Sequence, residues 1–311
     1  MDKIFVITLP FFALIGCGYL AGWKKIVPEA GIAGINTFVF YFALPSLLFR
    51  TMATRPLTEI LDLNFMGAYT LATLAVFAIG GAAARILFST GLGGSALVGL
   101  SGCYSNIGYL GLPLLIALLG EEVGVPVALV LAVDLVVSMS VAIVFLEADR
   151  EHGGQGLSGM KKIIKGVALN PLALGITAGI VVSAFDQGLF APLDTFTRIL
   201  GAAAGPSALF ALGASLVGRP ISSGFQMVSF MTFLKLVIHP IAVWVVMTQL
   251  FAIEPLWAAS AVLVAGLPVA GTVFVLSQRY DVLFARVSTT ILVSTIVAVA
   301  TFSVLLAILG Y

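Results

Sequence analysis

The sequence predicts an all-α membrane protein of ten transmembrane helices, arranged as two inverted five-helix repeats. Three observations support this fold class. Hydrophobic residues make up 60% of the chain and charged residues 9%, whereas a soluble domain carries about a quarter charged residues. The chain also divides into apolar segments of spanning length, and motifs from its first half return in its second half. The net charge of +1 offers no basic face for nucleic acid.

The apolar segments lie between charged residues and turn signals. A spanning helix needs about 20 mainly apolar residues. Ten segments qualify: 4–22, 32–49, 63–84, 95–119, 124–146, 166–185, 199–218, 225–250, 256–277 and 287–309. The long polar connection EADREHGGQGLSGMKK, 147–162, leaves five spans on each side. We therefore assign residues 1–148 to the first repeat, 149–162 to a linker loop and 163–311 to the second repeat.

The first span contains a stretch, LIGC, that is similar to a lipoprotein cleavage box ending at Cys17. The residues before it include only Asp2 and Lys3 as charges, and Pro10 interrupts the apolar run, so we expect a permanent helix instead of a cleaved signal. Cys17 and Cys103 both lie in apolar segments and predict neither a disulfide nor a metal site. We expect no cofactor.

The basic residues of the loops are unequally divided between the two sides of the membrane. One side has Lys3, Arg50, Arg55 and Arg198, and the other has Lys24, Lys25, Arg85, Arg150, Lys161, Lys162, Lys165, Arg219, Arg279 and Arg286. Because cytoplasmic loops carry the excess of Lys and Arg, we expect both termini outside the cell. The 147–162 loop is then cytoplasmic, and the protein is a multi-pass protein of the inner (plasma) membrane.

The two halves are related by repeated motifs. Pro10, Gly18 and the PSLLF stretch at 45–49 match Pro171, Gly179 and PSALF at 206–210, all at an offset of 161 residues. Ser105 and GLP at 111–113 match Ser260 and GLP at 266–268, at an offset of 155 residues. Five spans per half is an odd number, so a duplicated second half enters the membrane upside down and gives an inverted repeat.

The fourth and ninth predicted spans are interrupted by residues that suit a helix interior poorly. The stretch SNIGYLGLPLL, 105–115, carries Gly108, Gly111 and Pro113, and span 9 has Gly266 and Pro268 at the matching place. Proline is favoured at the first position of a helix. We therefore predict that Pro113 and Pro268 begin two half-helices that meet near the midplane from opposite sides.

Such breaks have an electrostatic consequence. The start of a half-helix presents unpaired N–H groups and the positive end of its dipole, which favour an anion. Carbonyl ends of half-helices favour a cation. The alternative is a pair of kinks without function, since Gly and Pro are frequent in membrane helices. Paired breaks in corresponding spans favour a binding site over kinks.

At these residues the sequence resembles the auxin efflux carrier family, which includes plant auxin exporters and bacterial permeases for malate or malonate. The resemblance covers the whole chain. It rests on SNIGYLGLPLLIALLG (105–120), LNPLALGI (169–176), KLVIHP (235–240) and LPVAGTVFVLSQRY (267–280). It implies crossed, broken helices 4 and 9, as in sodium/proton antiporters and bile-acid symporters. It also implies a core of spans 3–5 and 8–10 that moves against a scaffold of spans 1, 2, 6 and 7, and a homodimer formed by the scaffold.

The resemblance also implies roles for residues at the breaks. Asn106 matches a polar residue of the substrate site, and Pro113 and Pro268 match the crossover prolines. Many relatives have Asn where this chain has Thr272, so one amide is missing from the site. We include the break glycines Gly108, Gly111 and Gly266 among the candidate substrate-binding residues.

Two hydroxyl residues at matching repeat positions, Ser46 and Ser207, are further candidates for the substrate pathway. Small hydroxyl residues also serve as packing contacts between membrane helices, and the sequence leaves this alternative open.

Ionisable residues inside spans are costly and mark function. Asp134 lies ten residues into span 5, roughly 15 Å deep at 1.5 Å per residue, and is a candidate carrier of H⁺ or a ligand of Na⁺ with Ser138. The alternative is a structural pair with Lys235 of span 8. Lys235 is otherwise a fixed positive charge for an anionic substrate or a permanent occupant of a cation site. His239, one turn further, is a structural histidine or a proton relay.

The sequence therefore predicts a non-enzymatic secondary transporter of a small organic anion, a carboxylate such as a dicarboxylate or an auxin-like acid, working by alternating access of the elevator type with possible coupling to H⁺ or Na⁺. An uncoupled facilitator or channel is the main alternative. GLSG at 99–102 also resembles the GxSG motif of rhomboid proteases, with Ser101 as nucleophile and His239 as base. A duplicated ten-span chain disfavours that remote reading.

Overall fold

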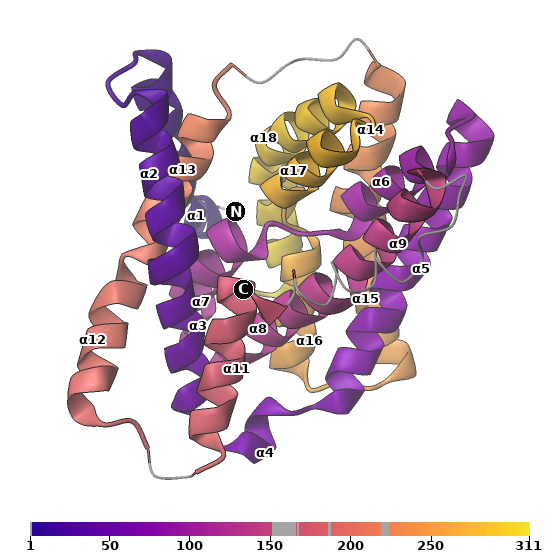
Figure 1. Cartoon of the computed structure of the whole chain (residues 1–311). Helices are drawn as coiled ribbons and strands as arrows, with labels where there is room; N and C mark the ends of the chain where they lie inside the picture. Colours follow the sequence, from indigo (N-terminus) through magenta and orange to yellow (C-terminus); the bar gives the residue numbers. More distant parts are fainter. Residues whose placement is uncertain (1, 151–165, 167, 186–187, 219–223) are drawn as a thin grey trace. The chain divides into compact units, whose positions relative to one another are not determined.

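The computed structural model describes residues 2–150, 166, 168–185, 188–218 and 224–311 (Figure 1). All regular elements in these ranges are helices, and an isolated antiparallel bridge joins Ser105 to Val269. The predicted all-α class is confirmed. Most of the predicted cytoplasmic loop, with Lys161, Lys162 and Lys165, and also Arg219, lies outside the described residues.

Within the described ranges, six helical segments are long and apolar enough to cross a membrane. They are Glu29–Ala53, Leu57–Phe88, Glu121–Arg150, Ala191–Ser215, Phe225–Leu250 and Phe284–Leu309. Each coincides with one of the predicted spans 2, 3, 5, 7, 8 and 10. Shorter apolar helices of 10–17 residues cover Leu9–Trp23, Leu92–Cys103, Ile107–Leu119, Pro171–Ser183 and Pro255–Ala265. Two of these, Leu92–Cys103 and Pro255–Ala265, end at the interruptions expected in spans 4 and 9.

The chain forms two compact units, each made of three separate stretches of sequence. Unit 1 comprises Met1–Leu63, Ile107–Ala132 and Ala168–Arg219. Its helices are α1 (Asp2–Trp23), α2 (Glu29–Phe38), η1 (Val39–Ala43), α3 (Leu44–Ala53), α4 (Leu57–Ile60), η2 (Ile107–Gly111), α7 (Leu112–Leu119), η3 (Glu121–Val123), α8 (Gly124–Val133), α11 (Pro171–Ser183), α12 (Ala191–Ala202) and α13 (Ala204–Ser215).

Unit 2 comprises Asn64–Asn106, Val133–Val167 and Pro220–Tyr311. Its helices are α5 (Leu63–Phe88), α6 (Leu92–Cys103), η4 (Asp134–Ser138), α9 (Met139–Arg150), α14 (Phe225–Phe233), η5 (Leu234–Ile238), α15 (His239–Val245), η6 (Val246–Leu250), α16 (Pro255–Ala265), α17 (Gly271–Tyr280) and α18 (Phe284–Leu309). Of the short η segments in the two units, η3 is a 3₁₀ turn and the others are π-helical. The predicted division into moving core and scaffold stays a prediction.

Unit 1 is built on two close helix pairs, α1 with α13 and α3 with α11, and Figure 1 shows α1 and α13 side by side. Glycine permits both contacts. A Cβ placed on Gly18 of α1 would collide with the Phe210 carbonyl oxygen of α13. A Cβ placed on Gly179 of α11 would lie 2.5 Å from the Phe49 carbonyl oxygen of α3. Small residues let helix backbones approach closely in membranes.

Unit 1 also has an ion pair between neighbouring helices. Arg50 of α3 donates from Nε to Asp194 of α12 at 2.7 Å, and its Nη1 lies 3.6 Å from Glu121. These groups are partly exposed, so the pairs add modest stability.

Unit 2 contains a buried apolar cluster and a hydrogen bond between a phenol and a carboxylate. Ala84, Val98, Met227, Met231 and Leu234 form one buried cluster. Outside the predicted span 9, Tyr280 of α17 donates a 2.6 Å hydrogen bond to Glu147 of α9. Partial burial, the hydrogen bond and the Glu147 charge raise the pKa of Tyr280 to about 12, so this phenol stays a donor at neutral pH.

The predicted starting points of the half-helices are wrong by several residues. Helix η2 begins at Ile107 and continues without interruption into α7, so Pro113 lies inside a helix. The π turn just before it shifts the hydrogen-bond pattern by one residue, which makes room for a proline ring. Pro268 lies in the non-helical stretch between α16 and α17, and the second half-helix begins at Gly271.

Candidate functional site

The two interrupted helices of the sequence meet through their backbones. The segment after α6 and the segment after α16 run antiparallel, with a bridge between Ser105 and Val269. The Asn106 N–H donates to the Pro268 carbonyl at 3.0 Å, and the Ala270 N–H donates to the Tyr104 carbonyl at 3.3 Å. Backbone that leaves a helix at membrane depth must find partners in the protein. The backbone groups of each break therefore find hydrogen-bond partners in the other break.

Helix α17 begins directly after this crossing and leaves its first turn open. Its N-cap residue, Ala270, is extended (φ −71°, ψ 144°) and makes no side-chain capping bond. No neighbouring atom lies within 4 Å of a Cβ built on Gly271, so there is open space beside the first residue of the helix. Thr272 is exposed and lies next to the Tyr104 side chain. An uncapped helix start with open space in front of it suits an anion.

Helix η2 begins at Ile107, the residue that follows the bridge in the sequence. Asn106 precedes it and is 5% exposed. The two half-helix starts therefore follow Asn106 and Ala270, residues that the backbone bridge itself positions. Gly266 also contributes to the close packing here, since a Cβ on it would lie 2.5 Å from Leu305 of α18.

Asp134 is fully buried at the start of the π turn η4. Its Oδ1 accepts a 3.1 Å hydrogen bond from Ser138, as expected from their i, i+4 spacing. Its Oδ2 has no hydrogen-bond partner in the described part of the chain. The buried hydroxyls of Ser105 and Tyr69 also lack partners there. Ser105 lies beside both Asp134 and Tyr69, so three polar residues gather next to the crossing.

Lys235 is also fully buried, in the π turn η5. Its Nζ donates to the Ala265 carbonyl at the end of α16 and lies 3.3 Å from Nδ1 of His239. The other ring nitrogen, Nε2, lies 3.3 Å from Thr73 Oγ1, and the ring also lies beside the Ala265 carbonyl. His239 therefore joins Lys235 to α5 with both ring nitrogens engaged.

Asp134 and Lys235 do not form the direct pair that was one alternative from the sequence. Among the described residues the ion pairs are those of Arg50 with Glu121 and Asp194, and of Arg55 with Glu59. Asp134 and Lys235 influence each other only as charges at longer range. Each is held by its own neighbours.

The remaining predicted site residues lie in unit 1. Ser46 of α3 and Ser207 of α13 are half-buried. Gly108 faces Leu44 and Leu172, and a Cβ built on it would lie 3.4 Å and 3.7 Å from their Cδ1 atoms. Pro113 lies against Gly205 of α13, whose Cβ would be 3.1 Å away. Gly111 is buried at the end of η2. These residues pack helices together within unit 1.

Sequence reasoning missed Tyr69, Thr73 and the carbonyl of Ala265. Tyr69 and Thr73 are four residues apart on α5 and so share a helix face, which is a readable signal for a polar stripe in an apolar span. The Ala265 carbonyl has no sequence signal, because every residue carries one.

The protease motif does not form a catalytic pair. The Ser101 hydroxyl is buried and donates to the Leu97 carbonyl of its own helix at 2.7 Å. His239, the supposed base, contacts Lys235 and Thr73.

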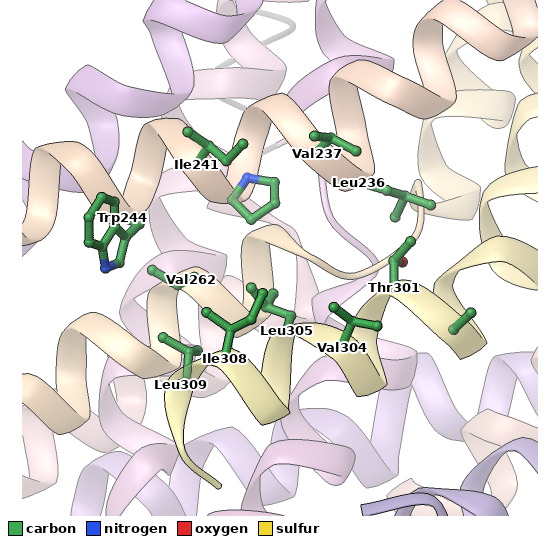
Figure 2. A pocket seen from close by; sticks show the side chains of 12 residues that line it. Leu236, Val237, Ile241, Trp244, Val262, Thr301, Val304, Leu305, Ile308 and Leu309 are labelled. Atoms are coloured by element: carbon green, nitrogen blue, oxygen red, sulfur yellow. The ribbon is translucent and has the colours of Figure 1, made fainter. Parts of the chain in front are cut away.

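A separate apolar pocket of about 590 Å³ lies in unit 2, between the η5–α15 segment, α16 and α18 (Figure 2). Figure 2 shows Ile241 and Trp244 on one side and Val304 and Ile308 on the other. The hydroxyl of Thr301 and the indole N–H of Trp244 are the polar side-chain groups among its lining residues. With no charged group in its lining, this pocket does not suit a carboxylate.

Comparison with known proteins gives concordant results. A family profile described as membrane transport protein matches residues 3–306. The chain is 34% identical over 308 residues to a Rhizobium meliloti (strain 1021) protein named "Putative malonate transporter", which covers 98% of this chain and 96% of that protein. It is 26% identical over 255 residues to the lysosomal cholesterol signaling protein of Mus musculus, covering 78% of this chain but 29% of the mouse protein.

Proposed function

Because the chain belongs to the auxin efflux carrier family of membrane transport proteins, we propose that this transporter carries a small organic anion, a mono- or dicarboxylate of the size of malonate. The observation that carries the proposal is the backbone bridge between the two broken helices, directly after which the half-helix α17 starts. The name of the Rhizobium relative supports a dicarboxylate in particular.

The anion binds at the crossing. The free N–H groups at the start of α17 receive a carboxylate, and the dipole of this half-helix favours its charge. Thr272 adjoins this start, and Asn106 belongs to the backbone bridge that precedes it. Thr272 is the exposed one, and it brings a hydroxyl to the substrate where many relatives resembling this chain have an amide.

Transport proceeds by alternating access of the elevator type. The bridge residues Ser105 and Val269, the start of α17, Asp134 and Lys235 all belong to unit 2, which supports a mechanism in which the anion site and the coupling group move together. Asp134 couples the movement to a cation, and we favour H⁺ over Na⁺. An uncoupled facilitator is the alternative, and a pH gradient that fails to drive accumulation in proteoliposomes would favour it.

The ten-span inverted repeat is supported by an exchange of contacts in unit 1. Gly18 packs against the Phe210 carbonyl, and Gly179 packs against the Phe49 carbonyl. Gly18 matches Gly179, and Phe49 matches Phe210, at the same offset of 161 residues. Each repeat thus supplies the glycine for one contact and the carbonyl for the other, as a two-fold pseudo-symmetric duplication requires.

The carrier resides in the inner (plasma) membrane with both termini outside, and it assembles as a homodimer through spans 1, 2, 6 and 7. A monomeric mass in mild detergent and in native membranes would contradict the dimer. Cytoplasmic labelling of either terminus would contradict the orientation.

Thr272→Ala should weaken carboxylate binding about tenfold in Kd, the effect of losing one hydrogen bond to a charged group. The measurement is the thermal shift of the purified protein titrated with malonate and a panel of mono- and dicarboxylates. Thr248→Ala is the matched control, since Thr248 is an exposed threonine whose hydroxyl bonds only within its own helix and to Gln249. Stabilisation of the wild type by cations alone, with no response to any carboxylate, would refute the anion assignment.

Ser101→Ala should leave carboxylate uptake unchanged. The substitution removes one hydrogen bond inside α6 and no group that we place at the anion site. Uptake into proteoliposomes, compared at equal amounts of folded protein, is the measurement. A hydrolytic activity lost in this variant would revive the protease reading.

A further inference from the structure

The C-terminal end of α16 lies in the buried interior of unit 2, and its last four carbonyl groups need hydrogen-bond donors. Val262, Leu263, Val264 and Ala265 are between 0% and 1% exposed, and the last four carbonyls of a helix have no partner inside it. The Gly266 N–H donates to the Val262 carbonyl at 3.0 Å and to the Leu263 carbonyl at 3.1 Å. The Leu267 N–H donates to the Val264 carbonyl at 3.1 Å. The carbonyl of Ala265 is left over.

The side chain of Lys235 supplies the missing donor. Its Nζ donates to the Ala265 carbonyl, at the negative end of the half-helix dipole. In carriers built from broken helices, such carbonyl ends coordinate a bound cation. Here the cation is part of the chain, and the π turn η5 and the contact with His239 hold it in position.

Lys235 has no carboxylate as an ion-pair partner among the described residues. Neither Asp134 nor another carboxylate of the described residues forms an ion pair with it. Its two hydrogen-bond partners, a carbonyl and an imidazole nitrogen, are both neutral acceptors. The carbonyl end of α16 therefore receives the Lys235 donor group without a carboxylate beside it.

We propose that the Lys235 ammonium is a tethered counter-ion that occupies a small-cation site at the carbonyl end of α16. Shortening the side chain opens this site to a free cation, of which a short primary alkylammonium ion is the best match because it presents the same N–H donors. It follows that this end of α16 needs no sodium ion in the wild-type protein. The inference concerns cation binding and does not depend on the identity of the substrate.

The test uses the purified full-length variant K235A and follows its thermal unfolding in ethylammonium, n-propylammonium or choline chloride at equal ionic strength. We expect both primary ammonium ions to raise the melting temperature of K235A relative to choline, which has no N–H donor. The wild type and K24A, which loses an exposed lysine, should show no such difference. Equal responses of all three proteins would overturn the proposal.

The variant K235M separates the charge from the volume of the side chain. Methionine fills the space but cannot donate, so we expect a melting temperature lower than that of the wild type by about 4 °C or more and no rescue by ammonium ions. If K235A cannot be obtained as folded protein, the test compares the yields of folded K235R and K235M. Arginine keeps the charge and the donors, so K235R should exceed K235M, and the reverse order would overturn the proposal.

Discussion

Asp134→Asn should abolish the accumulation of substrate driven by a pH gradient while leaving substrate binding in place. Asparagine keeps the shape of the side chain, and its amide oxygen can still accept the hydrogen bond that Ser138 donates at 3.1 Å. What it removes is the ability to gain and lose a proton. Because Asp134 is fully buried and Lys235 is not its ion-pair partner, a permanently charged carboxylate here would be costly. This cost is the physical reason to expect a proton carrier.

The measurement is uptake of labelled carboxylate into proteoliposomes with and without an imposed pH gradient. We expect D134N to reach only the equilibrium distribution, and we expect exchange of internal for external substrate to continue. Asp149→Asn is the control, since Asp149 is exposed near the end of the helix that follows η4. Undiminished accumulation in folded D134N would end the coupling hypothesis. Loss of substrate binding as well would assign Asp134 a structural role.

Gly18→Ala and Gly179→Ala should each destabilise the protein strongly, by about 3 kcal/mol. The added methyl group of Gly179→Ala would lie 2.5 Å from the Phe49 carbonyl oxygen and 2.6 Å from the Met52 Cβ. At Gly18 the methyl group would meet the Phe210 carbonyl oxygen. A backbone carbonyl cannot rotate away, so the helix pairs of unit 1 must separate.

Gly16→Ala is the matched control on the same helix, because no atom lies within 4 Å of its added methyl group. Its helix propensity should make it neutral or slightly stabilising. Thermal unfolding in detergent compares the three variants. If Gly18 and Gly179 are equivalent positions of a duplication, their substitutions should have similar effects. A Gly18→Ala protein as stable as Gly16→Ala would contradict the close-packing argument.

The helices and the existence of the two breaks could be predicted from sequence, because both depend on local composition. Apolar stretches with at most one charged residue predicted spans 2, 3, 5, 7, 8 and 10, and clustered Gly and Pro marked spans 4 and 9. The break positions could not be predicted, because they depend on which backbone groups pair across the crossing. The π turn that lets Pro113 remain inside a helix has no signature in the residues themselves.

The site was predicted in part. Asp134, Lys235 and His239 were identifiable because ionisable groups are rare in apolar spans, and the structure places all three in buried positions of unit 2. Their partners were harder to predict. Lys235 contacts a backbone carbonyl instead of a carboxylate, and a sequence cannot distinguish one carbonyl from another. Tyr69 and Thr73 were missed because hydroxyl residues are common in apolar spans and do not by themselves mark a site.

The crossing is held by main-chain hydrogen bonds, with Asn106 donating to Pro268 and Ala270 donating to Tyr104. Pro268 takes part through its carbonyl, so its lack of an N–H costs the bridge nothing. None of these bonds depends on side-chain identity. Substitutions at the bridge can therefore alter what the carrier selects without dismantling the support beneath it. Evolution of a new substrate range on this scaffold then requires changes in a few side chains and no change in architecture.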